Sequence, residues 1–177
     1  MAAERRSSAA AAPPQGASGL NVMIETKLWR NPCWLTFRLN YLALRYNVPL
    51  YSWVQRRYGL ARPEFVVIFS LGLMDGARAS DISQSSGFPK NTLSRAIQKL
   101  IKARLIQRNV DPADRRGQIL RLRPEGLRIF EEALPSFVEF EQRMLRTLSA
   151  KERDDLSRIM AKIVLDSVNW PEELPEE

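Results

Sequence analysis

A group of short polar and cationic side chains shares one side of a predicted helix that starts near Pro89. Its members are Lys90, Asn91, Thr92, Ser94, Arg95 and Lys99. Amide, hydroxyl and cationic groups bond to base edges and phosphate oxygens, and the N-terminal half of a recognition helix is the part that enters the major groove. The spacing therefore predicts a face that contacts double-stranded DNA.

The opposite side of this helix is an apolar stripe that must pack on a core. Leu93, Ala96, Ile97 and Leu100 recur at three- and four-residue spacing. A shorter helix over residues 80–86 precedes it, and Gly87 lets the chain turn between the two because glycine lacks the Cβ that restricts a sharp turn. Proline is favoured at a first helical position, which is where we expect Pro89. The pattern predicts a helix-turn-helix.

Two short strands are predicted after the second helix, over residues 105–110 and 118–122. The seven residues between them, Asp111 to Gly117, are rich in turn formers. A hairpin in this place is the wing of a winged helix-turn-helix.

In this region the chain resembles the MarR family of bacterial transcription regulators. The residues that carry the resemblance are Asp-Pro-Ala-Asp-Arg-Arg-Gly-Gln over 111–118 and Leu-Arg-Pro-Glu-Gly over 122–126. It implies that a wing aspartate, Asp114, holds a wing arginine, Arg116, for the minor groove, and Arg115 is counted with them as DNA-binding. The resemblance extends over roughly residues 30 to 170.

Two positions depart from the pattern of the resembled family. Arg104 stands where the family has glycine in the bend after the recognition helix, which predicts a strained or reshaped helix end. Arg123 stands where the family has a threonine, so the next helix lacks a hydroxyl N-cap.

Composition excludes several classes of protein. A chain of 177 residues is long enough for one domain with helical extensions. Its one cysteine, Cys33, excludes an internal disulfide framework and fits the cytoplasm. The absence of histidine removes the commonest zinc ligand and the commonest general base. We therefore expect no metal, no cofactor and no enzymatic activity.

The charge of the chain is concentrated where the helix and the wing are predicted. Residues 86–128 carry 11 basic and 3 acidic side chains, a net charge of +8, whereas residues 129–177 carry 6 and 12, a net charge of −6. A cluster of positive charge supplies most of the non-specific affinity for a polyanion. The charge distribution thus favours nucleic acid as the partner.

The predicted fold is mainly α with a small β-hairpin, a winged helix-turn-helix flanked by long N- and C-terminal dimerisation helices. The apolar run Phe65–Leu73 is too short to cross a membrane. The predicted parts are a disordered tail (1–19), an N-terminal dimerisation helix region (20–60), the winged helix-turn-helix (61–126), C-terminal dimerisation helices (127–170) and an acidic tail (171–177).

The flanking helices carry more apolar surface than one small domain buries. Residues 32–58 form a helical pattern that is apolar on more than one face, with a kink or a break into two helices expected at Pro49. Ser149 and Glu152 form a capping-box pattern before the last helix. We expect a two-fold homodimer, as in the resembled family, whose recognition helices lie about 34 Å apart and match a pseudo-palindromic operator.

Two sites are candidates for a releasing signal. The resemblance implies a small anionic or phenolic effector, for which aromatic and cationic side chains of the first long helix are suited: Trp34, Phe37, Arg38, Tyr41 and Arg45. Such residues at helical spacing also serve as core or as interface. Cys33 is similar in place to the cysteine of the family's peroxide-sensing branch, although an inert cysteine fits as well.

The sequence therefore predicts a DNA-binding transcriptional regulator, a repressor of MarR type that a small aromatic or acidic ligand releases. Two alternatives stay open. One is a thiol-based peroxide sensor that uses Cys33, and the other is a winged-helix module that binds protein. The polar face of the recognition helix counts against the second, because protein-binding faces are more apolar.

Overall fold

The computed structural model describes residues 19–112, 117–171 and 173. The chain divides into two compact units, residues 1–62 and 63–177. Most of the described residues lie in helices, and the one sheet among them is a two-stranded antiparallel hairpin. This confirms the predicted fold class.

The first unit consists of two helices, α1 (Val22–Arg30) and α2 (Trp34–Tyr58). The side chain of Asn21 accepts a hydrogen bond from the amide of Met23 and so caps α1. The sequence pattern did not predict α1 as a separate helix. Of the two outcomes expected at Pro49, a kink or a break into two helices, the break is wrong, because α2 continues through this proline. Gly59 ends α2 with a φ of 70°.

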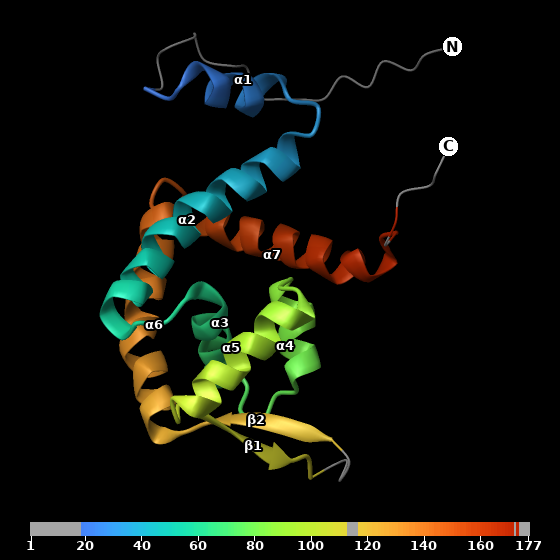
Figure 1. The fold of residues 1–177 in the computed structure, drawn as a ribbon. Helices are drawn as coiled ribbons and strands as arrows, with labels where there is room; N and C mark the ends of the chain where they lie inside the picture. The colour runs from blue at the N-terminus through green and yellow to red at the C-terminus, as the bar shows by residue number, and fades with distance from the viewer. Residues whose placement is uncertain (1–18, 113–116, 172, 174–177) are drawn as a thin grey trace. The chain divides into compact units, whose positions relative to one another are not determined.

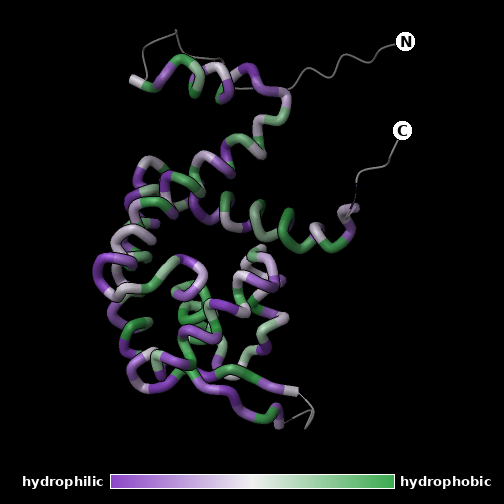
Figure 2. The backbone as a smooth tube through the Cα atoms, in the orientation of Figure 1, coloured by the Kyte–Doolittle hydropathy of each residue, from purple (hydrophilic) through white to green (hydrophobic). Residues whose placement is uncertain are grey.

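The core of the second unit forms around α3 (Arg62–Leu73), which is strongly hydrophobic (Figure 2). Phe65, Ile68 and Leu71 of α3 are almost fully buried. The ring of Phe65 stacks on that of Phe137, a residue of α6 (Pro124–Met144), with 5.2 Å between ring centroids. Ring stacking thus joins α3 to α6.

The helix-turn-helix consists of α4 (Ala79–Ser86) and α5 (Lys90–Lys102). Gly87 has a φ of 68° between them, the left-handed conformation that the sequence predicts for the turn. Pro89 is the N-cap of α5 and not its first helical residue, because its ψ of 140° is extended. The carbonyl of Pro89 nevertheless accepts the amides of Thr92 and Leu93 and so starts the helix.

The hairpin pairs β1 (Ile106–Val110) with β2 (Gln118–Leu122) and lies beside α4 and α5 within the second unit (Figure 1). Ile106 is opposite Leu122, and Val110 is opposite Gln118. The predicted second strand has the same bounds, and the first begins one residue later than predicted. A third segment joins the sheet where the amide of Leu120 donates to the carbonyl of Ala77, at 2.9 Å.

Two helices and one 3₁₀ turn follow the hairpin, namely α6, α7 (Ala150–Asp166) and η1 (Ser167–Asn169). The predicted capping box is present, since Ser149 accepts from the amide of Glu152 and the carboxylate of Glu152 accepts from the amide of Ser149. No residue of α7 is buried. In the described part of the chain, none of the helices has the length and hydropathy that a membrane span requires.

Candidate nucleic-acid interface

The apolar stripe of α5 fixes which side of the helix faces outward. Leu93, Ala96, Ile97 and Leu100 are each less than 5% exposed. The opposite face carries polar side chains, and it lies mostly in solvent, as in an amphipathic surface helix. Of the six predicted contact residues of α5, Thr92 is half-buried and the others are exposed: Lys90, Asn91, Ser94, Arg95 and Lys99.

Lys99 is also part of an ion pair inside the second unit. Its Nζ lies 2.9 Å from Oε1 of Glu64, a buried residue of α3. The lysine side chain remains 72% exposed, so its charge is still presented on the surface. The buried carboxylate neutralises part of that charge, and we therefore expect Lys99 to attract phosphate less strongly than Lys90.

A groove of about 330 Å³ runs between α4, α5 and β1. The cationic residues that line it are Lys90 of α5 and Arg108 of β1, and neither has an ion-pair partner within the described ranges. Ser80 and Ser94 add hydroxyl groups to the same groove. The sequence reading missed Arg108, although the two-residue alternation of a strand that starts on buried Ile106 puts it on the side of that core residue.

Asp111 is the buried acid at the end of β1. Its Oδ2 accepts hydrogen bonds from Nε and Nη2 of Arg78, at 2.9 and 2.5 Å. Its amide donates to the carbonyl of Gly117, at 3.0 Å. Asp111 thus joins the two sides of the wing and connects them to Arg78, which is the N-cap of α4. The predicted contacts Asp114, Arg115 and Arg116 lie outside the described residues.

A second ion pair joins the segment before α4 to the hairpin. Arg121 of β2 pairs with Asp75, and both side chains are more than a third exposed. Three links therefore connect residues 75–78 to the hairpin. Asp75 pairs with Arg121 of β2, Ala77 is bonded to Leu120 of β2, and Arg78 pairs with Asp111 at the end of β1. Sequence reasoning could not find either ion pair, because the partners are 33 and 46 residues apart.

The predicted strain at the end of α5 is confirmed. Arg104 has a φ of 58°, and it is the only residue other than glycine with a positive φ in the described part of the chain. The amide of Arg104 donates to the carbonyl of Ile101, and that of Leu105 to Leu100. This is the Schellman arrangement, with arginine in the position that usually takes glycine.

The absence of a side-chain cap before α6 is also confirmed. Arg123 is the N-cap and makes no capping hydrogen bond with its side chain, and Pro124 follows at the first helical position. The amide of Arg123 donates to the carbonyl of Leu105, at 2.9 Å. The start of α6 is thereby attached to the residue that precedes β1.

The five predicted effector residues lie along the N-terminal half of α2. The guanidinium of Arg38 lies 4.8 Å from the centroid of the Trp34 ring and donates to the carbonyl of Leu28. The rings of Phe37 and Tyr41 are 5.8 Å apart. Arg45, the fifth residue, is exposed.

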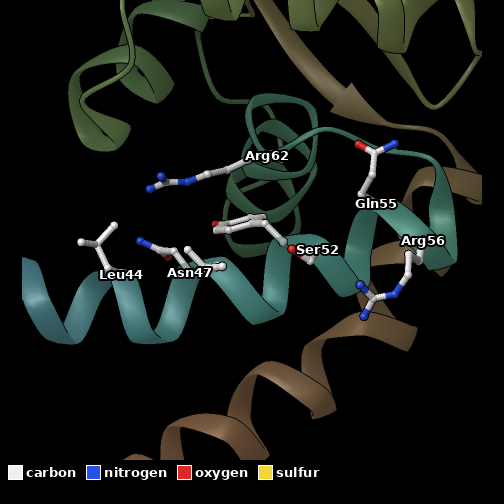
Figure 3. Close-up of a pocket in the computed structure, with 8 residues that line it drawn as sticks. Leu44, Asn47, Ser52, Gln55, Arg56 and Arg62 are labelled. Atoms are coloured by element: carbon white, nitrogen blue, oxygen red, sulfur yellow. The ribbon is translucent and has the colours of Figure 1, made fainter. Parts of the chain in front are cut away.

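An open groove of about 510 Å³ lies further along the same helix (Figure 3). None of the five predicted effector residues lines it; the lining residues are Leu44, Asn47, Val48, Tyr51, Ser52, Gln55, Arg56 and Arg62. Arg62 extends back over the turn that carries Asn47 and lies 5.2 Å from the ring of Tyr51. Burial raises the pKa of Tyr51, and the charge of Arg62 offsets part of this effect.

Cys33 is exposed and is the N-cap of α2. Its amide donates to the side chain of Asn31, at 2.9 Å. The predicted place of this cysteine, near the start of the first long helix, agrees with the structure. Within the described ranges, no cluster of acidic and thiol groups has the arrangement of a metal site.

The exposed polar face of α5, the cationic groove beside it and the attached hairpin define a winged helix-turn-helix of the DNA-binding type. Residues 58–117 match the model of the MarR family. Transcriptional regulator HosA of Escherichia coli O111:H- is 23% identical over 112 residues, which are 63% of this chain and 83% of the relative.

Solved structures agree with the family match. A MarR/EmrR family transcriptional regulator from Acinetobacter sp. ADP1 is similar with a TM-score of 0.68 and 23% identity, over 76% of this chain and 95% of that one. MepR of S. aureus in complex with DNA has a TM-score of 0.63 and 19% identity, over 75% of this chain and 95% of that one. Residues 58–117 thus match the MarR family, and the chain has the fold of the solved MarR-type regulators.

Proposed function

We propose that the protein is a homodimeric repressor that binds a pseudo-palindromic operator and that a small aromatic or acidic ligand releases. The observation that carries the proposal is the face of α5, where cationic, amide and hydroxyl side chains are exposed opposite a buried apolar stripe. The MepR structure, solved in complex with DNA, supports the same partner for this chain.

Each group of the interface has a proposed role. Asn91, Ser94 and Arg95 contact base edges in the major groove, because amide, hydroxyl and guanidinium groups match the donors and acceptors there. Lys90, Thr92 and Lys99 contact phosphates. Arg108 joins Lys90 as a phosphate contact, since both line the groove beside α5. Arg116, with Asp114 and Arg115, is proposed for the minor groove on the family resemblance alone.

The homodimer is proposed from apolar surface that each unit leaves in solvent. Leu42, Leu44 and Val48 of α2 are at least half exposed. In α7, Ile159 is 48% exposed and Val164 is 63% exposed. A monomer usually exposes large apolar side chains only singly, whereas each of these two helices exposes several. A two-fold partner that covers them would bring two copies of α5 to one duplex.

The effector is proposed to bind along α2. A flat acid suits this helix, because guanidinium groups lie beside its aromatic rings: Arg38 of the same helix beside Trp34, and Arg62 of α3 beside Tyr51. The groove at Asn47 and Tyr51 offers about 510 Å³, within the usual range for a ligand pocket. Oxidation of exposed Cys33 is the alternative signal, and alkylation by iodoacetamide faster than that of a free thiol would favour it.

The test is binding to the DNA immediately upstream of the protein's own coding region, titrated across salt concentrations and compared with a random duplex. We expect preference for a pseudo-palindrome and a steep loss of affinity with salt. Binding without sequence preference would contradict an operator in this DNA and favour a distant site or the protein-interaction module.

A pair of arginine variants sharpens the test. Arg95→Ala should weaken binding by about 1–3 kcal/mol and relax sequence preference, as loss of one base contact does. Arg146→Ala removes the same charge from an exposed residue after α6 and should change affinity little. Equal effects of the two substitutions would mean that only net charge, and not the face of α5, determines binding.

A further inference from the structure

The wing of this protein is attached to the helix-turn-helix by a buried carboxylate. Asp111 is 6% exposed, and its Oδ2 accepts from two nitrogen atoms of Arg78. Arg78 precedes α4 directly, and Asp111 follows β1 directly. The pair therefore connects the first helix of the helix-turn-helix to the far end of the hairpin, away from its junctions with α5 and α6.

Arg78 stands in a position that usually carries a small capping side chain. Helix N-caps favour Ser, Thr, Asp or Asn, whose oxygen accepts a backbone amide, and a guanidinium has no acceptor. Here the side chain makes no capping hydrogen bond, and the carboxylate of Asp81 accepts from the amide of Arg78 instead. The Arg78 side chain therefore donates to Asp111 and does not cap its own helix.

We propose that the Arg78–Asp111 pair positions the hairpin relative to α5, so that the wing and the recognition helix contact one duplex together. The inference rests on the proposed function, and it makes Arg78 and Asp111 positioning residues. The geometry favours this role over a purely local one. The amide of Asp111 also donates to the carbonyl of Gly117, so the residue that binds Arg78 joins the end of β1 to the start of β2.

The sign of one substitution separates positioning from simple electrostatics. Asp111→Asn removes a negative charge from the most basic part of the chain, so electrostatics alone would make DNA binding tighter. Positioning requires the opposite, because the amide holds the guanidinium less firmly than the carboxylate does. We expect Asp111→Asn to lose about tenfold in operator affinity, which is within the range for one specific DNA contact.

Arg78→Gln is the partner variant, and the two together form a double-mutant cycle. Each single substitution should weaken binding by a similar factor, and the double variant should be no weaker than either, since both remove one interaction. Arg78→Lys retains the charge and should restore part of the affinity. Asp75→Asn is the matched control: it breaks the exposed pair with Arg121 in the same segment and should change affinity less than about twofold.

Footprinting distinguishes misplacement of the wing from loss of the fold. On the upstream duplex, Asp111→Asn should lose hydroxyl-radical protection in the minor groove and retain protection of guanine N7 in the major groove below α5. Loss of both, with a lowered Tm, would mean that the pair is only structural. Unchanged or tighter binding by Asp111→Asn, with the minor groove still protected, would overturn the proposal.

Failure of the proposed function gives a different result. If the wild-type protein binds the upstream duplex no better than random DNA, the operator assignment fails. The same variants are then compared on random duplex at low salt, where the wing and α5 still meet the backbone. The positioning role predicts weaker binding by Asp111→Asn there also, and tighter binding would overturn it.

Discussion

The amide of Leu105 donates to the carbonyl of Leu100, at 3.0 Å, across a helix end at which the intervening Arg104 has a φ of 58°. Both leucines are buried, and they hold the two positions whose apolar side chains usually accompany a Schellman end. The chain therefore makes the family's turn without the family's glycine. The energetic cost of this turn lies in one residue, Arg104, which adopts the left-handed conformation despite its Cβ.

Arg104→Gly should stabilise the protein. The left-handed conformation costs about 1 kcal/mol or more for a residue with a Cβ, and the larger entropy of unfolded glycine offsets part of the gain. We expect a net increase of about 0.5 kcal/mol in the free energy of unfolding, measured by urea denaturation. Arg104→Ala removes the same charge but retains the Cβ, so a gain of equal size for alanine would contradict the strain.

Arg123→Ser should also stabilise the fold. Arg123 is the N-cap of α6 and supplies no side-chain acceptor, whereas a serine hydroxyl accepts a free amide of the first turn. The expected gain is about 1 kcal/mol in thermal or urea unfolding. Arg123→Ala provides no acceptor, and a matching gain there would show that loss of the arginine, and not capping, is responsible.

Gly126→Ala should destabilise the protein, although alanine is the better helix former. A Cβ at Gly126 would lie 2.2 Å from the carbonyl oxygen of Leu105, which cannot move easily because it accepts the amide of Arg123. Overpacking of this kind costs about 1–3 kcal/mol, against roughly 1 kcal/mol of helix propensity in the other direction. Thermal unfolding measures the sign, with Glu131→Ala on an exposed position of the same helix as the control. A raised Tm for Gly126→Ala would refute the close approach.

Acid should remove the contribution of the capping box at α7. Two hydrogen bonds hold the pKa of Glu152 below its ordinary value of 4.5. The larger effect comes from the Ser149 amide, and the smaller one comes from the Ser149 hydroxyl. Because the folded-state pKa is the lower one, the stabilisation is present above the unfolded pKa and is lost as pH falls through the folded pKa. The difference in urea midpoint between wild type and Glu152→Gln should therefore be larger at pH 7 than at pH about 3. Asp154→Asn controls for the loss of one charge, and a pH-independent difference for Glu152→Gln would contradict the mechanism.

Ile159→Glu should weaken the proposed dimer. This residue of α7 is 48% exposed, and a charge placed in an apolar interface loses its hydration without a partner. Sedimentation at micromolar concentration should show a shift toward monomer. Lys162→Glu, on a nearby exposed position of α7, should leave the dimer intact. A stable monomer for the wild-type protein would refute dimerisation itself.

The sequence predicts well those features that depend on neighbouring residues. The stripe Leu93–Leu100, the turn at Gly87 and the capping box at Ser149 each need only three or four residues of context, and all three are present. The strand 118–122 has the predicted bounds for the same reason. Local patterns thus define most elements of the winged helix.

Features that depend on distant contacts were not predictable in the same way. Nothing near Arg78 indicates Asp111, and nothing near Lys99 indicates Glu64, because each pair forms only when separate elements pack. Pro49 suggested a kink or a break, and α2 continues through it without a break. The family resemblance identified Asp114 as the acid of the wing, whereas the acid whose contacts the structure describes is Asp111.

The hydrogen bond between the Leu120 amide and the Ala77 carbonyl encloses both α4 and α5 in one loop of chain. Closing that loop carries an entropic cost, so the bond forms only when the enclosed helices have a stable place to pack. Opening of the hairpin would in turn release both ends of the helix-turn-helix together. The exchange rate of the Leu120 amide proton in D2O therefore reports on whether the helix-turn-helix and the hairpin stay packed together. DNA that contacts both the helix-turn-helix and the hairpin should slow that exchange.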